Sequence, residues 1–254
     1  MAEHRSGFAS FVGRPNVGKS TLTNALVGEK IAITSAKPQT TRRAIRGIVH
    51  RDFGQLILVD TPGLHRPRTL LGQRLNDLVE QTLGDVDVIG FCIPANEKIG
   101  PGDNFINEQL NEFRRAKLVA IITKSELVSP EQLADQLVAV SQLRDWRAIV
   151  PVSAKTGIGT EDLLNAIRGL LPERERLYGE DEITTASERT LAAELIREKL
   201  FRLLGEELPY SAMVEIEKYE IVDGLRRAPH PTHTHLARTL EWIATFKPGR
   251  ALLT

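Results

Sequence analysis

Eight residues near the start of the chain have the types and spacing of a phosphate-binding loop: Gly13-Arg14-Pro15-Asn16-Val17-Gly18-Lys19-Ser20. The apolar run 7–12 before them predicts a strand, and residues 21–27 after them predict a helix, with Thr21 completing the binding segment. Glycines let backbone N–H groups surround an anion, and the helix N-terminus adds partial positive charge. We expect Lys19 to reach the outer phosphates and the Ser20 hydroxyl to bind Mg²⁺. A plain strand–turn–helix with a chance lysine is the alternative.

A second candidate group, Asp60-Thr61-Pro62-Gly63, follows the apolar run 55–59. A carboxylate at a strand end near a phosphate loop can hold Mg²⁺ through water, so Asp60 is expected to do so. The amide of Gly63 is expected to approach a γ-phosphate. The same four residues also suit an ordinary turn, which would carry no chemistry.

A third group, Pro38-Gln39-Thr40-Thr41-Arg42, lies between the first predicted helix and the next predicted strand. A threonine here, such as Thr41, can coordinate Mg²⁺ only when a γ-phosphate is present, which would make the loop a switch. A polar surface loop is the alternative.

Two further groups predict a choice of base: Thr123-Lys124-Ser125-Glu126 after the run 118–122, and Ser153-Ala154-Lys155 after the run 149–152. The Lys124 stem can pack on a purine ring, and the Glu126 carboxylate can accept hydrogen bonds from guanine N1 and N2. A backbone amide at 153–155 can donate to guanine O6. Adenine presents a different edge, so these residues favour GTP over ATP. Each group alone also suits an ordinary loop, and the order of all five along one chain favours the nucleotide interpretation.

The elements that must position these residues form an α/β pattern. Near-continuous apolar strands separated by amphipathic helices predict a mostly parallel sheet covered by helices on both faces. Ligands bind such sheets at the carboxyl ends of the strands, where the candidate groups fall. We predict further strands at 44–49, 56–59, 86–93, 118–122 and 149–152 and helices at 70–83, 104–113 and 130–143.

The regular pattern ends near Leu171-Pro172, so we predict a first domain over 1–172. Residues 173–186 mix acidic and basic side chains and are typical of a linker. From residue 187 we predict a smaller α+β domain. Its helix would be capped by the spacing Thr185…Glu188, bear an apolar face from Leu191 and end at Gly205. Residues 213–221 alternate as a half-buried strand.

Composition narrows the class of protein. Of 254 residues, 33 are Lys or Arg and 33 are Asp or Glu, so net charge favours no class of partner. The one cysteine, Cys92, lies in an apolar run and is expected to be a buried core residue, which excludes an intrachain disulfide. No apolar run approaches the roughly 18 residues of a membrane span, and we expect no signal peptide. These features predict a cytoplasmic protein.

Together the motifs resemble the bacterial Era family, a translation-factor-class P-loop GTPase with a C-terminal KH domain. The resemblance rests on residues 13–20, 38–42, 60–64 and 153–155, and it continues through 194–199 and 207–211. It implies hydrolysis of GTP to GDP and phosphate, binding to the 3′ end of small-subunit ribosomal RNA, and roles in small-subunit assembly and ribosomal RNA maturation. It also implies a monomer, with peripheral association at the inner face of the cell membrane.

In the mechanism that the resemblance implies, Lys19, Thr41 and Gly63 act on the reacting phosphate. Ser20 and Thr41 ligate Mg²⁺, and Asp60 holds it through water. One class of GTPases orients water with a glutamine at the position of Leu64, so we expect slow intrinsic hydrolysis. Asn16 resembles the asparagine that related GTPases use to hold K⁺, and a simple turn residue is the alternative.

Two features depart from the family pattern. Glu126 stands where the family has aspartate, and we expect GTP specificity to survive with weaker affinity. No G-x-x-G loop follows Ile221, although a KH domain clamps RNA with such a loop. We therefore expect an incomplete, KH-like domain over 187–254. A GTPase switch that has lost specific RNA binding remains an alternative, and a P-loop ATP-using enzyme is a less favoured one. His230, His233 and His235 do not match a common metal-ligand spacing, which favours a solvated tail.

Overall fold

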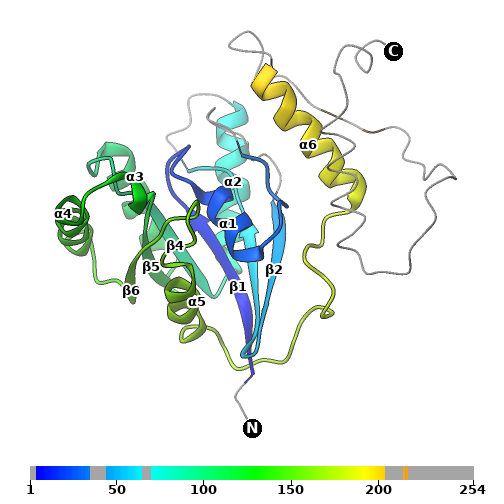
Figure 1. The fold of residues 1–254 in the computed structure, drawn as a ribbon, viewed down its shortest axis with the longest axis horizontal. Coiled ribbons are helices and arrows are strands. Elements are labelled where there is room, and N and C mark those ends of the chain that lie inside the picture. The colour runs from blue at the N-terminus through cyan, green and yellow to red at the C-terminus, as the bar shows by residue number, and fades with distance from the viewer. Residues whose placement is uncertain (1–3, 35–43, 65–69, 204–213, 215, 217–254) are drawn as a thin grey trace, which may run out of the picture. The chain divides into compact units, whose positions relative to one another are not determined.

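The structure, a computed structural model, describes residues 4–34, 44–64, 70–203, 214 and 216 (Figure 1). The chain divides into two compact units, residues 1–185 and 186–254. The first unit carries most of the described secondary structure.

The first unit is built on a six-stranded sheet in the order β2-β3-β1-β4-β5-β6. All neighbouring strands pair in parallel except the edge strand β2, which is antiparallel to β3. The predicted mostly parallel sheet is therefore confirmed. The strands are β1 (Arg5–Val12), β2 (Ile45–Arg51), β3 (Gly54–Asp60), β4 (Val88–Pro94), β5 (Lys117–Thr123) and β6 (Ala148–Pro151).

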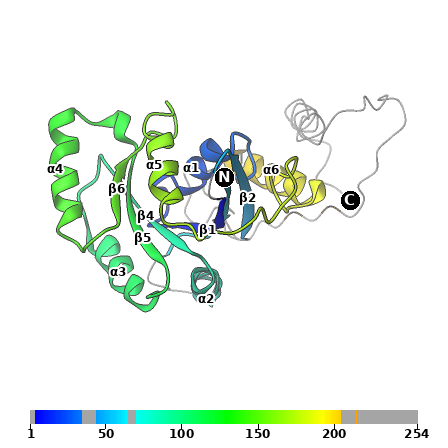
Figure 2. The same cartoon turned by 90° about the horizontal axis from the view of Figure 1, so that it is seen from below.

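Helices cover both faces of this sheet, as the apolar runs predict (Figure 2). On one face, α1 (Lys19–Val27) and α5 (Thr160–Arg168) pack a core around Phe11, Leu22 and Leu164. The other face is covered by α2 (Leu70–Gly84), α3 (Pro101–Gln109) and α4 (Pro130–Ser141), whose apolar side chains form a second core. The central strands are buried on both sides, which explains their continuous apolar sequences.

Two helices differ from the prediction. The helix expected over 104–113 begins at Pro101, ends at Gln109 and is followed by a 3₁₀ turn over Leu110–Glu112. Its early start has a local cause, because the Asp103 carboxylate accepts a hydrogen bond from the Gly100 amide at 2.9 Å. Helix α5 was not predicted. It begins after Gly159, whose φ of +77° and close approach to the Pro151 carbonyl require glycine.

The segment predicted as a linker is hydrogen-bonded to the sheet. Gln55 on β3 donates to the Tyr178 carbonyl at 2.6 Å and accepts from the amides of Leu177 and Tyr178 at 2.7 and 3.0 Å. Farther along, the Ile48 amide of β2 donates to the Ile183 carbonyl at 2.8 Å. Composition does not reveal these contacts, because they are made by backbone groups of the segment.

The second unit is described mainly through α6 (Glu188–Leu203). Its N-cap is Ser187, whose hydroxyl accepts a hydrogen bond from the Thr190 amide at 3.2 Å, so the cap lies two residues after the predicted Thr185. Ala192 and Leu195 pack with Ile216. Three further predictions lie outside the described residues. They are the remaining residues of the strand predicted over 213–221, the helix end at Gly205 and the three tail histidines.

Cys92 lies at the centre of β4 and is fully buried, as its apolar surroundings predict. Burial raises the pKa of its thiol to about 12. Among the described helices, none is both long and apolar enough to cross a membrane.

Candidate nucleotide-binding and catalytic site

The predicted phosphate loop connects β1 directly to α1, with Gly18 at the helix N-cap in a left-handed conformation (φ +101°). Gly13 has a φ of +152°, and a Cβ atom there would lie 2.6 Å from the carbonyl oxygen of Cys92. Asn16 also has a positive φ, of +64°. These conformations suit a loop whose amides turn inward at a helix N-terminus, which is an anion-binding geometry.

Lys19 lies within this loop and is 7% exposed. Its Nζ donates to the carbonyl oxygens of Gly13 at 3.1 Å and Arg14 at 2.9 Å. Burial lowers the pKa of Lys19, and the nearby Asp60 carboxylate opposes that shift. The phosphate loop therefore holds the Lys19 ammonium group against its own backbone carbonyls.

Ser20 and Asp60 meet, as predicted for a shared Mg²⁺. The Ser20 hydroxyl donates to the two Asp60 carboxylate oxygens at 3.2 and 3.0 Å, and Asp60 is 1% exposed. They come together because β1 and β3 are adjacent and parallel. Hydroxyl and carboxylate oxygens are the donors that Mg²⁺ prefers, so the pair fits that ion. Thr41, the other predicted ligand, lies outside the described residues with the rest of 38–42.

Gly63 lies against the phosphate loop. A Cβ atom on it would be 3.1 Å from Lys19 Nζ and 3.2 Å from the Pro15 amide nitrogen. Leu64, in contrast, has its side chain in the second core and is 2% exposed. The Leu64 side chain therefore does not line the site. Thr61, between Asp60 and Pro62, is buried beside Ser10.

The two predicted base-binding groups follow the adjacent parallel strands β5 and β6. Thr123 Oγ1 donates to the Val17 carbonyl at 2.6 Å, which ties the first group to the phosphate loop. Lys124 has a left-handed backbone (φ +57°), and the Ser125 amide donates to the Val152 carbonyl at 3.2 Å. Glu126 is exposed on the following turn, so its carboxylate is accessible to a base.

Ser153, Ala154 and Lys155 form a tight turn. The Ser153 hydroxyl accepts from the Thr156 amide at 3.1 Å, and its carbonyl accepts from the Gly157 amide at 2.8 Å. The structure thus brings the described members of four predicted groups to the carboxyl ends of β1, β3, β5 and β6.

Sequence reasoning missed an ionic chain beside these groups. Arg14 Nε donates to Asp103 Oδ1 at 2.8 Å, and its Nη2 donates to Glu97 Oε2 at 2.8 Å. Asp103 is fully buried. The run Gly100-Pro101-Gly102-Asp103 is a typical helix start and was the one hint in the sequence. An acidic side chain at such a position can also accept a hydrogen bond from a neighbouring cationic side chain.

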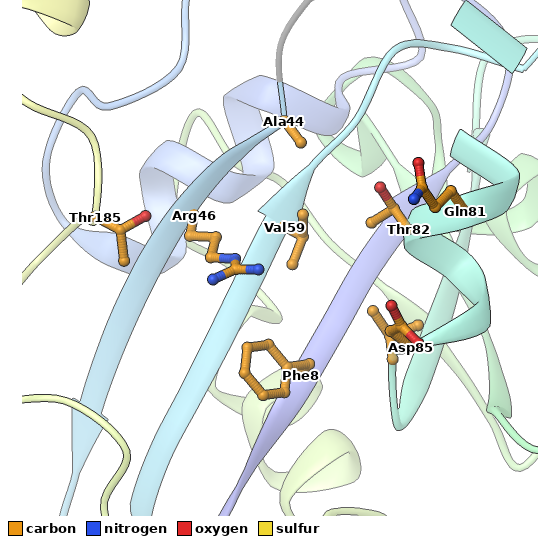
Figure 3. Close-up of a pocket in the computed structure, with 9 residues that line it drawn as sticks. Phe8, Ala44, Arg46, Val59, Gln81, Thr82, Asp85 and Thr185 are labelled. Carbon is orange, nitrogen blue, oxygen red and sulfur yellow. The ribbon is translucent and has the colours of Figure 1, made fainter. Parts of the chain in front are cut away.

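A separate pocket of about 470 Å³ lies between β1, β2, β3 and the end of α2 (Figure 3). Phe8 and Arg46 form one side, with the Arg46 guanidinium carbon 5.8 Å from the centre of the Phe8 ring. Thr82 and Asp85 lie opposite, and Thr185 closes one end. Its described lining residues include none of the predicted nucleotide groups, so the pocket is distinct from the nucleotide site.

Known proteins are similar to this chain in sequence and in fold. A family described as 50S ribosome-binding GTPase matches residues 8–124. GTPase Era of Nocardioides sp. is 57% identical over 226 residues, which cover 87% of this chain and 72% of the relative. The chain belongs to the Era family of GTPases.

Two solved Era structures have the same fold. Aquifex aeolicus Era, as a variant bound to GDP.AlF4⁻, is 35% identical with a TM-score of 0.77, over 81% of this chain and 70% of that one. Era in complex with MgGDPNP and nucleotides 1506–1542 of 16S ribosomal RNA is 36% identical, with the same TM-score and coverage.

Membership in the Era family makes this chain a GTP-hydrolysing enzyme that binds GTP and GDP. The predicted family resemblance, the fold of the GTPase domain and the enzyme class are thereby confirmed. The roles of individual site residues stay predictions.

Proposed function

We propose that this Era-family GTPase is a nucleotide-controlled switch in the assembly of the small ribosomal subunit and the maturation of its ribosomal RNA. The main support for a nucleotide-controlled switch is one observation. At the carboxyl ends of two adjacent parallel strands, the structure brings together Lys19, Ser20, Asp60 and Gly63. The ribosomal role is supported by the relative crystallised with nucleotides 1506–1542 of 16S ribosomal RNA.

In the proposed reaction, water attacks the γ-phosphate, and GDP and phosphate leave. Lys19 and the loop amides neutralise charge on the β,γ-phosphate oxygens, and the Gly63 amide donates to the γ-phosphate. Ser20 and Thr41 would hold Mg²⁺ directly and Asp60 through water, and the bound ion would withdraw charge from the phosphates. Thr41 can join only when a γ-phosphate is present, which distinguishes the GTP state from the GDP state.

The rate of hydrolysis depends on the groups that orient the attacking water and on the positive charge near the γ-phosphate. Leu64 places an apolar side chain in the core, where it cannot orient water, so the proposed intrinsic rate is slow. Asn16, on the phosphate loop with a positive φ, is the proposed K⁺ contact. A monovalent cation there would add the positive charge that some GTPases take from an arginine.

Specificity for guanine is proposed for the turns after β5 and β6. The stem of Lys124 packs along the base, the Glu126 carboxylate accepts from N1 and N2, and a backbone amide at Ala154 donates to O6. Glutamate is one methylene longer than the aspartate usual in the family, so the guanine contacts are expected to be weaker and still specific.

A second candidate is a GTPase switch without specific RNA binding. It is favoured by the absence of a G-x-x-G sequence between Ile221 and Thr254, because that loop is what clamps RNA in a KH domain. The family resemblance also supports a monomeric cytoplasmic protein with peripheral membrane association as a further proposal.

Binding to RNA separates the two candidates. We would titrate the full chain with an RNA copying the 3′ end of small-subunit ribosomal RNA, in the presence of GDP or a non-hydrolysable GTP analogue, across a salt series. A scrambled RNA of equal length is the control. Tight binding that requires the analogue and the correct sequence supports the assembly role. Weak, salt-sensitive binding that depends neither on the RNA sequence nor on the nucleotide would support the second candidate, a GTPase switch without specific RNA binding.

A further inference from the structure

Glu97, in the turn after β4, lies between two cations of the nucleotide site. Its Oε2 accepts a hydrogen bond from Arg14 Nη2 at 2.8 Å, and its Oε1 lies 4.0 Å from Lys124 Nζ. Arg14 belongs to the phosphate loop and Lys124 to the first base-binding group. One carboxylate therefore contacts both halves of the site.

The chain of charges continues into the protein. Arg14 Nε donates to Asp103, whose carboxylate is fully buried and also accepts from the Gly100 amide. Asp103, Arg14, Glu97 and Lys124 thus alternate in sign. Burial lowers the pKa of Arg14, but its hydrogen bonds to Asp103 and Glu97 outweigh that effect and raise the pKa overall. The guanidinium is a permanent charge that holds Glu97 in place.

The backbone that carries Glu97 is also fixed. The side-chain nitrogen of Gln136 on α4 donates to the carbonyls of Pro94 at 3.2 Å and Glu97 at 3.0 Å. On the other side, the Ala95 amide donates to the Thr123 carbonyl at 2.8 Å, one residue before Lys124. The turn is therefore pinned to α4 and to the base-binding group.

We propose that Glu97 is a positioning residue for guanine nucleotide binding, which holds the Lys124 ammonium so that its stem lies along the base. The proposal rests on the base-binding role of Lys124 given under the proposed function. A lysine stem has four carbons and loses freedom when it packs against a ligand, so an anchored head group lowers that loss. The side chains of Lys124 and Glu97 are 30% and 44% exposed, so water and salt screen the pair.

The test measures GDP dissociation constants for the full chain and for Glu97→Gln, Lys124→Met and the double variant. For a half-exposed ion pair we expect Glu97→Gln to weaken binding about two- to five-fold at low salt. The loss should fade at about 1 M salt, where the screening length is short. In the Lys124→Met background, Glu97→Gln should have no further effect. Glu112→Gln, an equal change of charge at an exposed residue, should leave affinity unchanged.

Comparing the affinities for GDP and inosine diphosphate distinguishes a specific role of Glu97 from a general distortion of the site. Inosine diphosphate lacks the 2-amino group, which in the proposed binding mode is held by Glu126 and not by the Lys124 stem. Glu97→Gln should therefore weaken binding of GDP and inosine diphosphate by the same factor, whereas Glu126→Gln should weaken GDP more.

Two results would overturn the positioning role of Glu97 alone. One is unchanged GDP affinity of Glu97→Gln at low salt, and the other is an equal loss in the wild-type and Lys124→Met backgrounds. If Lys124→Ala, which removes the stem that would pack on the base, binds GDP as tightly as the wild type, the base-binding role of Lys124 is wrong and the positioning role of Glu97 is wrong with it. The single variants thus separate a failure of the proposal from a failure of the function beneath it.

Discussion

Replacing Gln55 by leucine should release residues 177 and 178 from β3. Gln55 is fully buried, and its side-chain amide makes three hydrogen bonds to the backbone of Leu177 and Tyr178. Leucine has a similar volume and leaves little cavity, so the change removes mainly these hydrogen bonds. Each contributes about 0.5–1.5 kcal/mol, and water can reach the released groups because residues 177 and 178 are at the surface. We expect the free energy of unfolding to fall by about 2 kcal/mol.

Amide hydrogen exchange and urea denaturation of the full chain would measure this effect. The amides of Leu177 and Tyr178 should lose protection before the sheet opens, and the urea midpoint should fall. Gln142→Leu, at an exposed position, is the matched control. If both amides stayed protected in Gln55→Leu and its free energy of unfolding matched that of the control, the stabilising role of the Gln55 hydrogen bonds would be refuted.

Four predictions concern the nucleotide. Asp60→Asn removes the buried charge beside Ser20 and should weaken Mg²⁺ binding at least about ten-fold by calorimetry, and unchanged binding would exclude Asp60 from that site. Gly63→Ala places a methyl against Lys19 and should slow GTP hydrolysis at least about ten-fold while sparing GDP affinity, so parallel losses would contradict it. Glu126→Asp should tighten GTP binding several-fold in equilibrium titrations, and weaker binding would show that the longer side chain is preferred. K⁺ should raise the hydrolysis rate over Na⁺ at saturating Mg²⁺, and equal rates would leave Asn16 as a turn residue.

The sheet and the described site groups were predictable because their signals are local. An apolar run of five or six residues predicts a buried strand, and a glycine-rich loop after it predicts where the ligand binds. Parallel pairing then brings Ser20 and Asp60 together although they are 40 residues apart. Once β1 and β3 are neighbours, their carboxyl ends must meet.

The features that were missed depend on partners far away in sequence. Gln55 is a polar residue in a strand, and only the fold shows that its amide is satisfied by residues more than 120 positions later. Glu97 and Arg14 are likewise 83 positions apart. The helix cap moved from Thr185 to Ser187 because both residues suit a cap, and local sequence does not decide between neighbouring candidates.

The buried thiol at the centre of β4 has a practical consequence for experiments on this chain. The thiolate is the form of cysteine that attacks alkylating reagents, and burial keeps Cys92 protonated and out of their reach in the folded state. A dye or spin label directed at an introduced surface cysteine should therefore mark that position alone, with the native cysteine left in place. The slow rate at which Cys92 itself is labelled would measure the rate at which the sheet opens.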